Sequence, residues 1–211
     1  MTSHAVKEGP GVYAVNTLDY YDENAEAFVQ GTLHADMNRI RQEFLNYLPE
    51  GGGTILDLGC GSGRDSLAFR NAGYEVVAVD GSKELCRRAC ALIGQPVVCS
   101  TFQQYTPAPG VRFGGIWACA SLLHLKPDEL VPVISKLTDA LLAQGIWYMS
   151  FKYGEFRGER GGRYFTDLTE NSLTALLEQV PALRLLKTSI TQDVRPGRDG
   201  ERWLNAFLMR S

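Results

Sequence analysis

The sequence predicts an α/β protein with a mostly parallel seven-stranded sheet, helices on both faces and a C-terminal antiparallel hairpin. From Thr54 onward, short apolar runs alternate with amphipathic stretches, as strands alternate with helices in a parallel sheet. The first apolar run leads directly into a glycine-rich turn. The last two β-like runs, 183–194 and 202–209, are joined by a turn-rich link too short for a crossover helix. They are therefore expected to pair antiparallel.

The elements are expected in the following order. Five strands are predicted at 54–58, 74–79, 96–100, 113–119 and 146–151, and the first of them is expected to be buried. Helices are predicted at 65–71, at 83–92, from Pro127 to about residue 143, and at 169–180. Ser82 is a suitable N-cap for the second of these helices, and Gly94 is placed to end it. Residues 17–48 contain two further helix-like stretches, and residues 1–211 are expected to form a single domain.

Composition and charge argue against several classes of protein. The formal net charge is -3, without the excess of Lys and Arg that nucleic-acid binding requires, so no nucleic-acid partner is expected. The five cysteines form no C-x-x-C pair, so neither a metal site nor a disulfide framework is predicted. Residues 1–10 lack the apolar segment of a signal peptide, and the longest near-apolar stretch, 114–125, is too short to span a membrane. A cytoplasmic location is expected.

The segment that carries chemistry runs from Ile55 to Gly63. An apolar strand enters a G-x-G-x-G turn at Gly59, Gly61 and Gly63, and a helix follows. Such a turn lets a ligand approach the backbone closely. The dinucleotide pattern G-x-G-x-x-G/A is not met, because Arg64 or Ser66 occupies its last position. Asp57, inside the strand, would repel a pyrophosphate but suits a ligand that carries an ammonium group and a sulfonium.

Asp80 ends the second predicted strand, about 20 residues beyond the glycines, where an acid accepts hydrogen bonds from ribose hydroxyls. The alternative for Asp80 is a turn acid beside Gly81. Leu56-Asp-Leu-Gly-Cys-Gly-Ser-Gly63 and Val77-Ala-Val-Asp80 resemble the first two motifs of class I S-adenosylmethionine (SAM)-dependent methyltransferases. Gly63-Arg-Asp-Ser66 is similar to the small bacterial enzymes of the tellurite-resistance type.

This resemblance covers roughly residues 17–211. It implies lid helices in 17–48, a Rossmann-like core in 54–211, SAM as cofactor with S-adenosylhomocysteine as product, and a small-molecule acceptor. The expected cofactor-binding residues are Tyr20, Tyr21, Asp57, Gly59, Cys60, Gly61, Gly63, Arg64, Asp80, Gly81, Phe102, Gln103, Cys119 and Ala120. Arg64 and Arg39 are alternatives for the SAM carboxylate. The chain departs from the family pattern at two places. Ser100-Thr-Phe-Gln-Gln104 lacks the acid that in many relatives bonds the adenine amino group, and Phe113-Gly-Gly-Ile116 lacks the acid that often follows the Phe at the start of strand four.

His124 is the candidate general base because its ordinary pKa lies near neutrality, with a structural role as the alternative. The glycine-rich stretch 152–165 is expected to be a mobile binding loop that contributes Lys152, Tyr153, Arg163 and Tyr164 to the substrate site. Within it, Arg157, Arg160 and Arg163 are candidates for binding a carboxylate or another anion.

The sequence therefore predicts a SAM-dependent methyltransferase that acts on a small molecule by in-line displacement. Two alternatives are a non-catalytic SAM-binding protein and a dinucleotide-dependent oxidoreductase.

Overall fold

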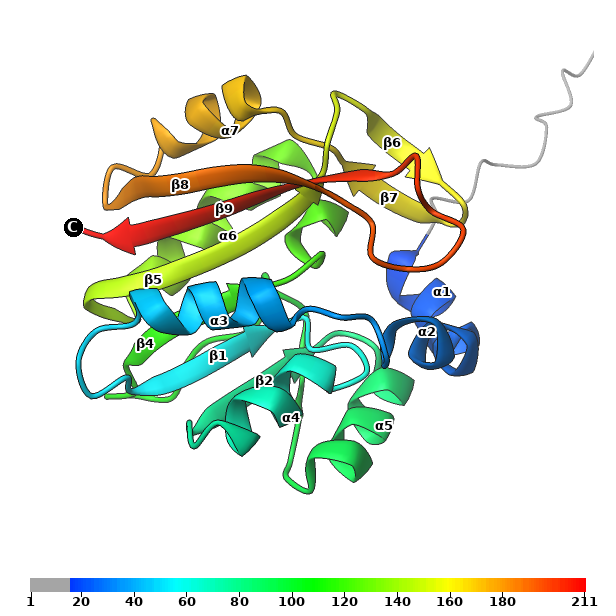
Figure 1. Ribbon diagram of the computed structural model, residues 1–211, viewed down its shortest axis with the longest axis horizontal. Helices are drawn as coiled ribbons and strands as arrows, with labels where there is room; N and C mark the ends of the chain where they lie inside the picture. The colour runs from blue at the N-terminus through cyan, green and yellow to red at the C-terminus, as the bar shows by residue number, and fades with distance from the viewer. Residues whose placement is uncertain (1–15) are drawn as a thin grey trace, which may run out of the picture.

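The structure is a computed structural model that describes residues 16–211 (Figure 1). Expectations about residues 1–10 lie outside this range. The chain begins with helices α1 (Thr17–Glu23), α2 (Ala25–Thr32) and α3 (Asn38–Tyr47). The first half of the α/β region follows, and its elements are β1 (Thr54–Leu58), α4 (Arg64–Asn71), β2 (Val76–Asp80), α5 (Lys83–Ile93), β3 (Val98–Cys99) and β4 (Phe113–Ala118). None of the described helices has the length and apolar character needed to cross a membrane.

The second half of the chain adds three sheet strands, a small separate hairpin and two longer helices. Its elements are the short 3-10 helix η1 (Leu122–His124), α6 (Pro127–Thr138), β5 (Leu141–Lys152), β6 (Arg157–Arg160), β7 (Arg163–Thr166), α7 (Glu170–Leu177), β8 (Leu183–Gln192) and β9 (Arg202–Arg210). Strands β6 and β7 pair only with each other, as an antiparallel hairpin.

The main sheet has seven strands in the order β3-β2-β1-β4-β5-β9-β8. Strands β1 to β5 pair in parallel, and β9 is antiparallel to both β5 and β8. The expected fold class is thus confirmed. The order reverses between β1 and β4, and a crevice outside the carboxyl ends at such a point is where ligands bind in this architecture. Within the hairpin, the antiparallel strand β9 lies inside the sheet and β8 forms its edge.

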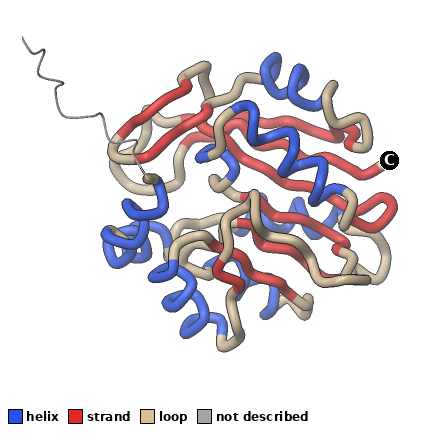
Figure 2. The backbone as a smooth tube through the Cα atoms, turned by 180° about the vertical axis from the view of Figure 1, so that it is seen from behind, coloured by secondary structure: helices blue, strands red, loops and turns tan. Residues whose placement is uncertain are grey.

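Helices cover both faces of the sheet (Figures 1 and 2). On one face, Phe44 of α3 and Phe69 of α4 pack around Trp117 of β4. On the other face, α6 and α7 pack against residues of the opposite pleat, among them Ile116 and Trp147. Because neighbouring strand residues point to opposite faces, β4 is buried on both sides, as a central parallel strand should be.

Two predicted segments differ from the structure. The helix from Pro127 ends at Thr138 rather than near residue 143, because Leu141 already pairs with Phe113 at the start of β5. The stretch predicted as a mobile loop contains the β6–β7 hairpin, whose turn is formed by Gly161 and Gly162. Pairing between strands therefore decided the local structure where residue propensity alone was ambiguous. The predicted helical region 17–48 holds three helices, since the first stretch is interrupted at Asn24.

Candidate functional site

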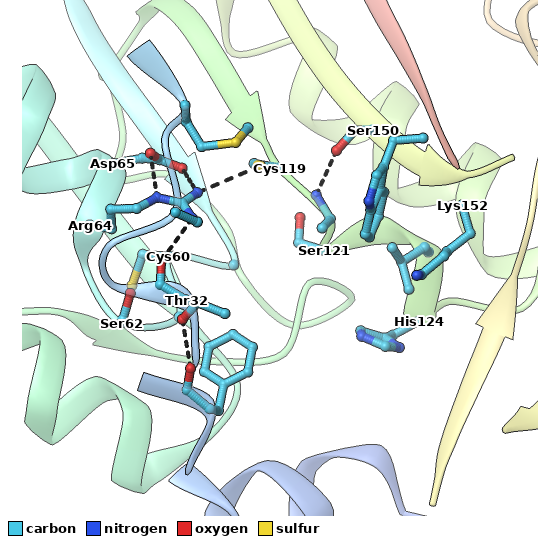
Figure 3. Close-up of a pocket in the computed structure, with 18 of the residues that line it drawn as sticks. Thr32, Cys60, Ser62, Arg64, Asp65, Cys119, Ser121, His124, Ser150 and Lys152 are labelled. Carbon is cyan, nitrogen blue, oxygen red and sulfur yellow. Dashed lines mark hydrogen bonds and ion pairs between the residues drawn. The ribbon is translucent and has the colours of Figure 1, made fainter. Parts of the chain in front are cut away.

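A cavity of about 510 Å³ lies at the carboxyl ends of the parallel strands (Figure 3). Its walls come from α1, from the segment between α2 and α3, from the glycine turn after β1 and from the ends of β2, β4 and β5. The link between β8 and β9 completes it. Figure 3 shows Cys60, Arg64 and Cys119 on one side, and Ser150, Lys152 and His124 on the other. One continuous space therefore joins the glycine turn to the ends of β4 and β5.

The two sequence motifs are bonded to each other. One carboxylate oxygen of Asp80 accepts the backbone N–H of Gly61 at 2.9 Å, and the other accepts the N–H of Ser82 at 2.9 Å. Burial raises the pKa of Asp80, while these backbone N–H groups oppose the rise. Gly59 must be glycine, because its φ is 83° and an added Cβ would lie 2.4 Å from Cβ of Ser121. The turn thus exposes its backbone and the Asp80 carboxylate to the cavity.

Two further acids, Asp57 and Asp65, line the cavity together with the glycine turn. The Asp57 carboxylate accepts the hydroxyl of Ser66 at 2.6 Å, and burial together with the charge of Asp65 raises the pKa of Asp57 to about 7. Asp65 accepts hydrogen bonds from Arg64, from Arg41 and from the indole of Trp117. Burial alone would raise the pKa of Asp65, but the two guanidiniums outweigh it and hold that pKa lower. Asp57 is accordingly the weaker acid of the pair.

The guanidinium of Arg64 donates hydrogen bonds to other groups of the protein. Its Nε and Nη2 donate to the two oxygens of Asp65 at 2.9 and 2.6 Å, and its Nη1 donates to the carbonyl of Thr32 at 3.1 Å (Figure 3). Arg39 is exposed at the cavity wall. Of the two alternatives for holding a carboxylate, Arg39 therefore has the freer donors.

The end of β4 is strained and tied to its neighbours. Ala120 has a φ of 53°, a left-handed conformation that costs a residue with a Cβ about 1–2 kcal/mol. Its N–H donates to Oγ of Ser150 at 2.8 Å, and the Ser121 hydroxyl donates to the carbonyl of Leu58 at 2.6 Å. Strain of this kind is typical of functional sites. The pKa of the neighbouring Cys119 is raised to about 12 by burial, so its thiol stays protonated.

Phe102 and Gln103 line the same cavity, beside the glycine turn. The Phe102 ring lies 3.2 Å from the position of a Cβ built on Gly59. The Gln103 amide donates to Oε1 of Glu129 at 2.9 Å. An aromatic face is therefore available at this end of the cavity, together with the backbone of Thr101 to Gln103.

His124 is buried and bonded through both ring nitrogens. Its Nδ1 lies 2.7 Å from the carbonyl oxygen of Tyr164 and must donate, which leaves Nε2 to accept from the hydroxyl of Tyr21 at 2.7 Å. Burial lowers the pKa of His124 to about 4. At neutral pH the ring is therefore uncharged, with its remaining lone pair directed at the α1 side of the cavity.

Helix α1 contacts this histidine through Tyr21. The Tyr21 ring contacts Phe28 and His124 edge-on, with centroids 5.2 and 5.4 Å away. The side chain of Thr17 accepts the N–H of Tyr164, which fastens α1 to the β6–β7 hairpin. No residue of α1 is fully buried. We call α1 and α2 together (residues 17–32) the lid.

Four of the residues predicted from the sequence lie off the cavity wall. Tyr20 packs under Arg163 and against Gly162 instead. Gly63 faces Ala89 of α5, where a Cβ would be only 3.2 Å from the Ala89 Cα, so it serves helix packing. Tyr153 is covered by the guanidinium of Arg202, and Tyr164 acts on the site through its backbone. The other residues expected to bind cofactor or substrate line the cavity, whereas Arg157 and Arg160, two of the candidates for binding an anion, do not.

Sequence reasoning missed the wall formed by the C-terminal hairpin. Trp203 lines the cavity, with its indole N–H on Asp193 at 3.1 Å and the Lys152 ammonium 4.7 Å from its ring centroid. Asp193 is in turn paired with Arg195 at 2.5 Å, and Lys152 with Glu201. Burial lowers the pKa of Lys152 to about 8. The only available signal was that Trp203 follows a turn-rich link, which does not reveal that this link bends over the cavity.

Comparisons with known proteins agree with this architecture. A family model described as a methyltransferase domain matches residues 55–145, and one described as tellurite resistance protein TehB matches residues 17–90. A comparison with curated proteins finds no match.

Solved structures share the fold at low sequence identity. The 1,6-didemethyltoxoflavin-N1-methyltransferase of Burkholderia thailandensis is 19% identical with a TM-score of 0.70, over 92% of this chain and 84% of that one. The N-methyltransferase NodS of Bradyrhizobium japonicum is 17% identical with a TM-score of 0.69, over 92% and 98%. The CcbJ methyltransferase of Streptomyces caelestis is 15% identical with a TM-score of 0.72, over 93% and 99%.

The alternative of a dinucleotide-dependent oxidoreductase is not supported by any of these matches. Both motifs of the first half fall inside the matched ranges, and the fold is shared with the related structures. The chain is therefore similar to SAM-dependent methyltransferases in two matched segments, residues 17–90 and 55–145, and in its fold.

Proposed function

We propose that this enzyme binds SAM along the glycine turn and transfers its methyl group to a small molecule held between the lid and the ends of β4 and β5. The observation that carries the proposal is the continuity of the cavity. The same space contains Gly59 and Asp80 at one end and His124 and Lys152 at the other. A donor and an acceptor can therefore meet without leaving the protein, and holding two reactants in line supplies much of such a reaction's acceleration.

The residues present suit the cofactor. The Asp80 carboxylate has lone pairs left for ribose hydroxyls after it accepts two backbone N–H groups. The Phe102 ring offers a stacking face for adenine, and Arg39 has free donors for the amino-acid carboxylate. Tyr21 and Phe28 present aromatic rings to the cavity, and such rings stabilise a sulfonium through cation–π attraction. When bound, SAM supplies a methyl group on a cationic sulfur, ready for displacement by a nucleophile.

The chain contributes position, exclusion of water and a place for a proton. The lid covers the cavity through Tyr21 and Phe28. His124 keeps a neutral ring whose Nε2 lone pair accepts a hydrogen bond on the cavity side. We propose that this nitrogen takes the proton of a protonated acceptor after the Tyr21 hydroxyl moves aside. With a pKa of about 4 in the closed arrangement, it is a weak base, so release of Tyr21 is part of the step.

The relatives support a small-molecule acceptor. Two of the related structures are named for small-molecule substrates, 1,6-didemethyltoxoflavin and magnesium protoporphyrin IX. We propose an acceptor of this broad class, handled by residues 1–211 as one domain. We also propose a cytoplasmic location, because the described residues carry five free cysteines, which persist in reducing compartments.

The test is calorimetric titration of the purified protein with SAM, S-adenosylhomocysteine and NAD. We expect one-to-one binding of SAM and S-adenosylhomocysteine and no NAD signal. Asp80→Ala should weaken SAM binding at least tenfold, about 1.4 kcal/mol. Asp199→Ala, an exposed acid outside the cavity, is the matched control and should bind SAM normally.

If SAM binds, release of S-adenosylhomocysteine then reports turnover in a screen of amines, phenols, carboxylic acids, thiols and tellurite. Turnover with any of these acceptors, reduced in His124→Gln, would support the proposal. Absence of SAM binding would overturn it.

A further inference from the structure

The β6–β7 hairpin carries three arginines in three different situations. Arg160 is paired with Asp167, whose carboxylate oxygens lie 2.9 and 3.2 Å from its guanidinium nitrogens. Arg157 is exposed and does not line the cavity. Arg163 does line the cavity, next to Tyr21 and His124. Of the three, Arg163 is the one positioned to meet an acceptor.

Arg163 is surrounded by aromatic rings instead of carboxylates. Its guanidinium carbon lies 4.5 Å from the ring centroid of Tyr20, 5.6 Å from that of Tyr21 and 5.2 Å from that of Phe165. Its Nη1 donates to the Tyr21 hydroxyl at 3.3 Å. None of the ion pairs within residues 16–211 includes it. The rings stabilise the positive charge but accept no hydrogen bond from its N–H groups.

The Nε of Arg163 is the decisive atom. It is the one buried side-chain nitrogen or oxygen in the described part of the chain that has no hydrogen-bond partner. A charged donor left without a partner costs more than an ordinary lost hydrogen bond, and such a group in a native fold calls for an explanation. Because Nη1 already serves Tyr21, the unused edge of the guanidinium is formed by Nε and Nη2. Two parallel N–H groups on one edge match the two oxygens of a carboxylate.

The acids on the opposite wall of the cavity do not supply that carboxylate. Asp193, the acid of the opposite wall, is held by Arg195 and by the Trp203 indole. Glu201 pairs with Lys152 and Arg198. The protein is acidic overall, with a net charge of -3, yet the charge left uncompensated at the acceptor end of the cavity is positive.

We propose that the Nε–Nη2 edge of Arg163 binds a carboxylate of the methyl acceptor, which makes the substrate a small organic acid. This inference rests on the proposed methyltransferase function and names its substrate class. The acid would reach this edge when α1 shifts. No residue of α1 is fully buried, and the hydrogen bonds that fasten α1 to the hairpin are those of Thr17 and Tyr21. The carboxylate would then accept the hydrogen bond for which Nε of Arg163 has no partner, and it would hold the acceptor beside His124.

The experiment uses the full chain saturated with S-adenosylhomocysteine, titrated calorimetrically with paired probes. The probes are acetate, benzoate, 4-hydroxybenzoate and indole-3-acetate, each beside its amide. We expect at least one carboxylate to bind ten times more tightly than its amide. Arg163→Gln should remove that difference, and Arg163→Lys, which keeps the charge without the paired edge, should retain only part of it. Arg160→Gln on the same hairpin is the matched control and should keep the full difference.

Three outcomes would overturn the inference: no carboxylate binds, amides bind as tightly as acids, or Arg163→Gln keeps the preference while its urea midpoint matches that of the wild type. A loss of all binding in Arg163→Gln counts for the inference only if S-adenosylhomocysteine still binds. If S-adenosylhomocysteine fails to bind the wild-type chain, the proposed function itself falls. The two failures are therefore distinguishable.

Discussion

The hydroxyl of Tyr21 lies 2.7 Å from Nε2 of His124, although 103 residues separate them in sequence. One belongs to the lid and the other to the short 3-10 helix after β4, so this single hydrogen bond joins the lid to the centre of the site. Since Nδ1 of His124 is held by the Tyr164 carbonyl, the tautomer that accepts from Tyr21 is fixed by a third segment, the β6–β7 hairpin. Closure of the lid and the state of the histidine are thus coupled.

Removing the Tyr21 hydroxyl should loosen the lid. A hydrogen bond of this kind contributes about 0.5–1.5 kcal/mol, so Tyr21→Phe should speed SAM dissociation about two- to tenfold. Stopped-flow release of the cofactor measures the rate. Tyr20→Phe is the matched control, because the Tyr20 ring lies outside the cavity and its hydroxyl has no hydrogen-bond partner among the described residues. Equal rates in the two variants would contradict a latch at Tyr21.

The buried histidine should make the fold sensitive to acid. The pKa of His124 is about 4 in the folded chain and 6.5 in a free side chain, so the unfolded state takes up its proton first. Stability is unaffected above pH 6.5, falls as pH drops from 6.5 toward 4, and loses about 3 kcal/mol over that window. His124→Gln keeps an amide near the position of Nε2 without titrating. Urea unfolding of both proteins at several pH values should give a shallower slope for the variant, and parallel slopes would refute the assignment.

Asp65 should be essential to the fold. It accepts hydrogen bonds from Arg41 at 2.6 Å, from Arg64 at 2.6 and 2.9 Å and from Trp117 at 3.0 Å. Asp65→Asn leaves two largely buried guanidiniums without a counter-charge, and breaking a buried pair in this way costs about 3–5 kcal/mol. Urea unfolding should show that loss. Arg87→Gln, which breaks an exposed ion pair with Glu84, should leave the midpoint nearly unchanged.

Local patterns predicted the helices and strands around the glycine turn well. Ser82 and Gly94 bound α5 as expected, because a side-chain cap and a left-handed glycine are encoded by single residues. The order of elements also predicted the parallel sheet and the antiparallel C-terminal hairpin. The position of β9 inside the sheet was not predicted, since it depends on which strand edge the hairpin reaches and not on any local signal.

The candidate site was predictable where a motif exists and not where distant segments meet. Gly59, Asp80 and His124 were found from sequence because their residue types and spacing carry chemical meaning. The link between Arg41 and Asp65 was not found, because it requires α3 to lie across the end of α4. The wall around Trp203 was missed for the same reason: its residues are ordinary in sequence and become part of the cavity only through the fold.

Ala120 provides a test of whether backbone strain at the end of β4 serves the reaction. Its φ of 53° is costly for alanine and ordinary for glycine, so Ala120→Gly relieves about 1–2 kcal/mol in the folded state. Glycine also gives the unfolded chain more freedom, which returns about 0.5–1 kcal/mol. We therefore expect a net gain in stability of up to about 1.5 kcal/mol, seen in urea unfolding.

The control for Ala120→Gly is Gln144→Gly, which relieves a left-handed residue with a φ of 61° in the irregular first part of β5, outside the cavity. Both variants should be as stable as the wild type or slightly more so. Only Ala120→Gly should slow methyl transfer, because a freer backbone no longer holds the end of β4 against Ser150, to which the Ala120 N–H is bonded. If Ala120→Gly instead keeps full turnover with the gained stability, the strain is incidental, and the geometry of the β4 tip is set by the Ser121 and Ser150 hydrogen bonds alone.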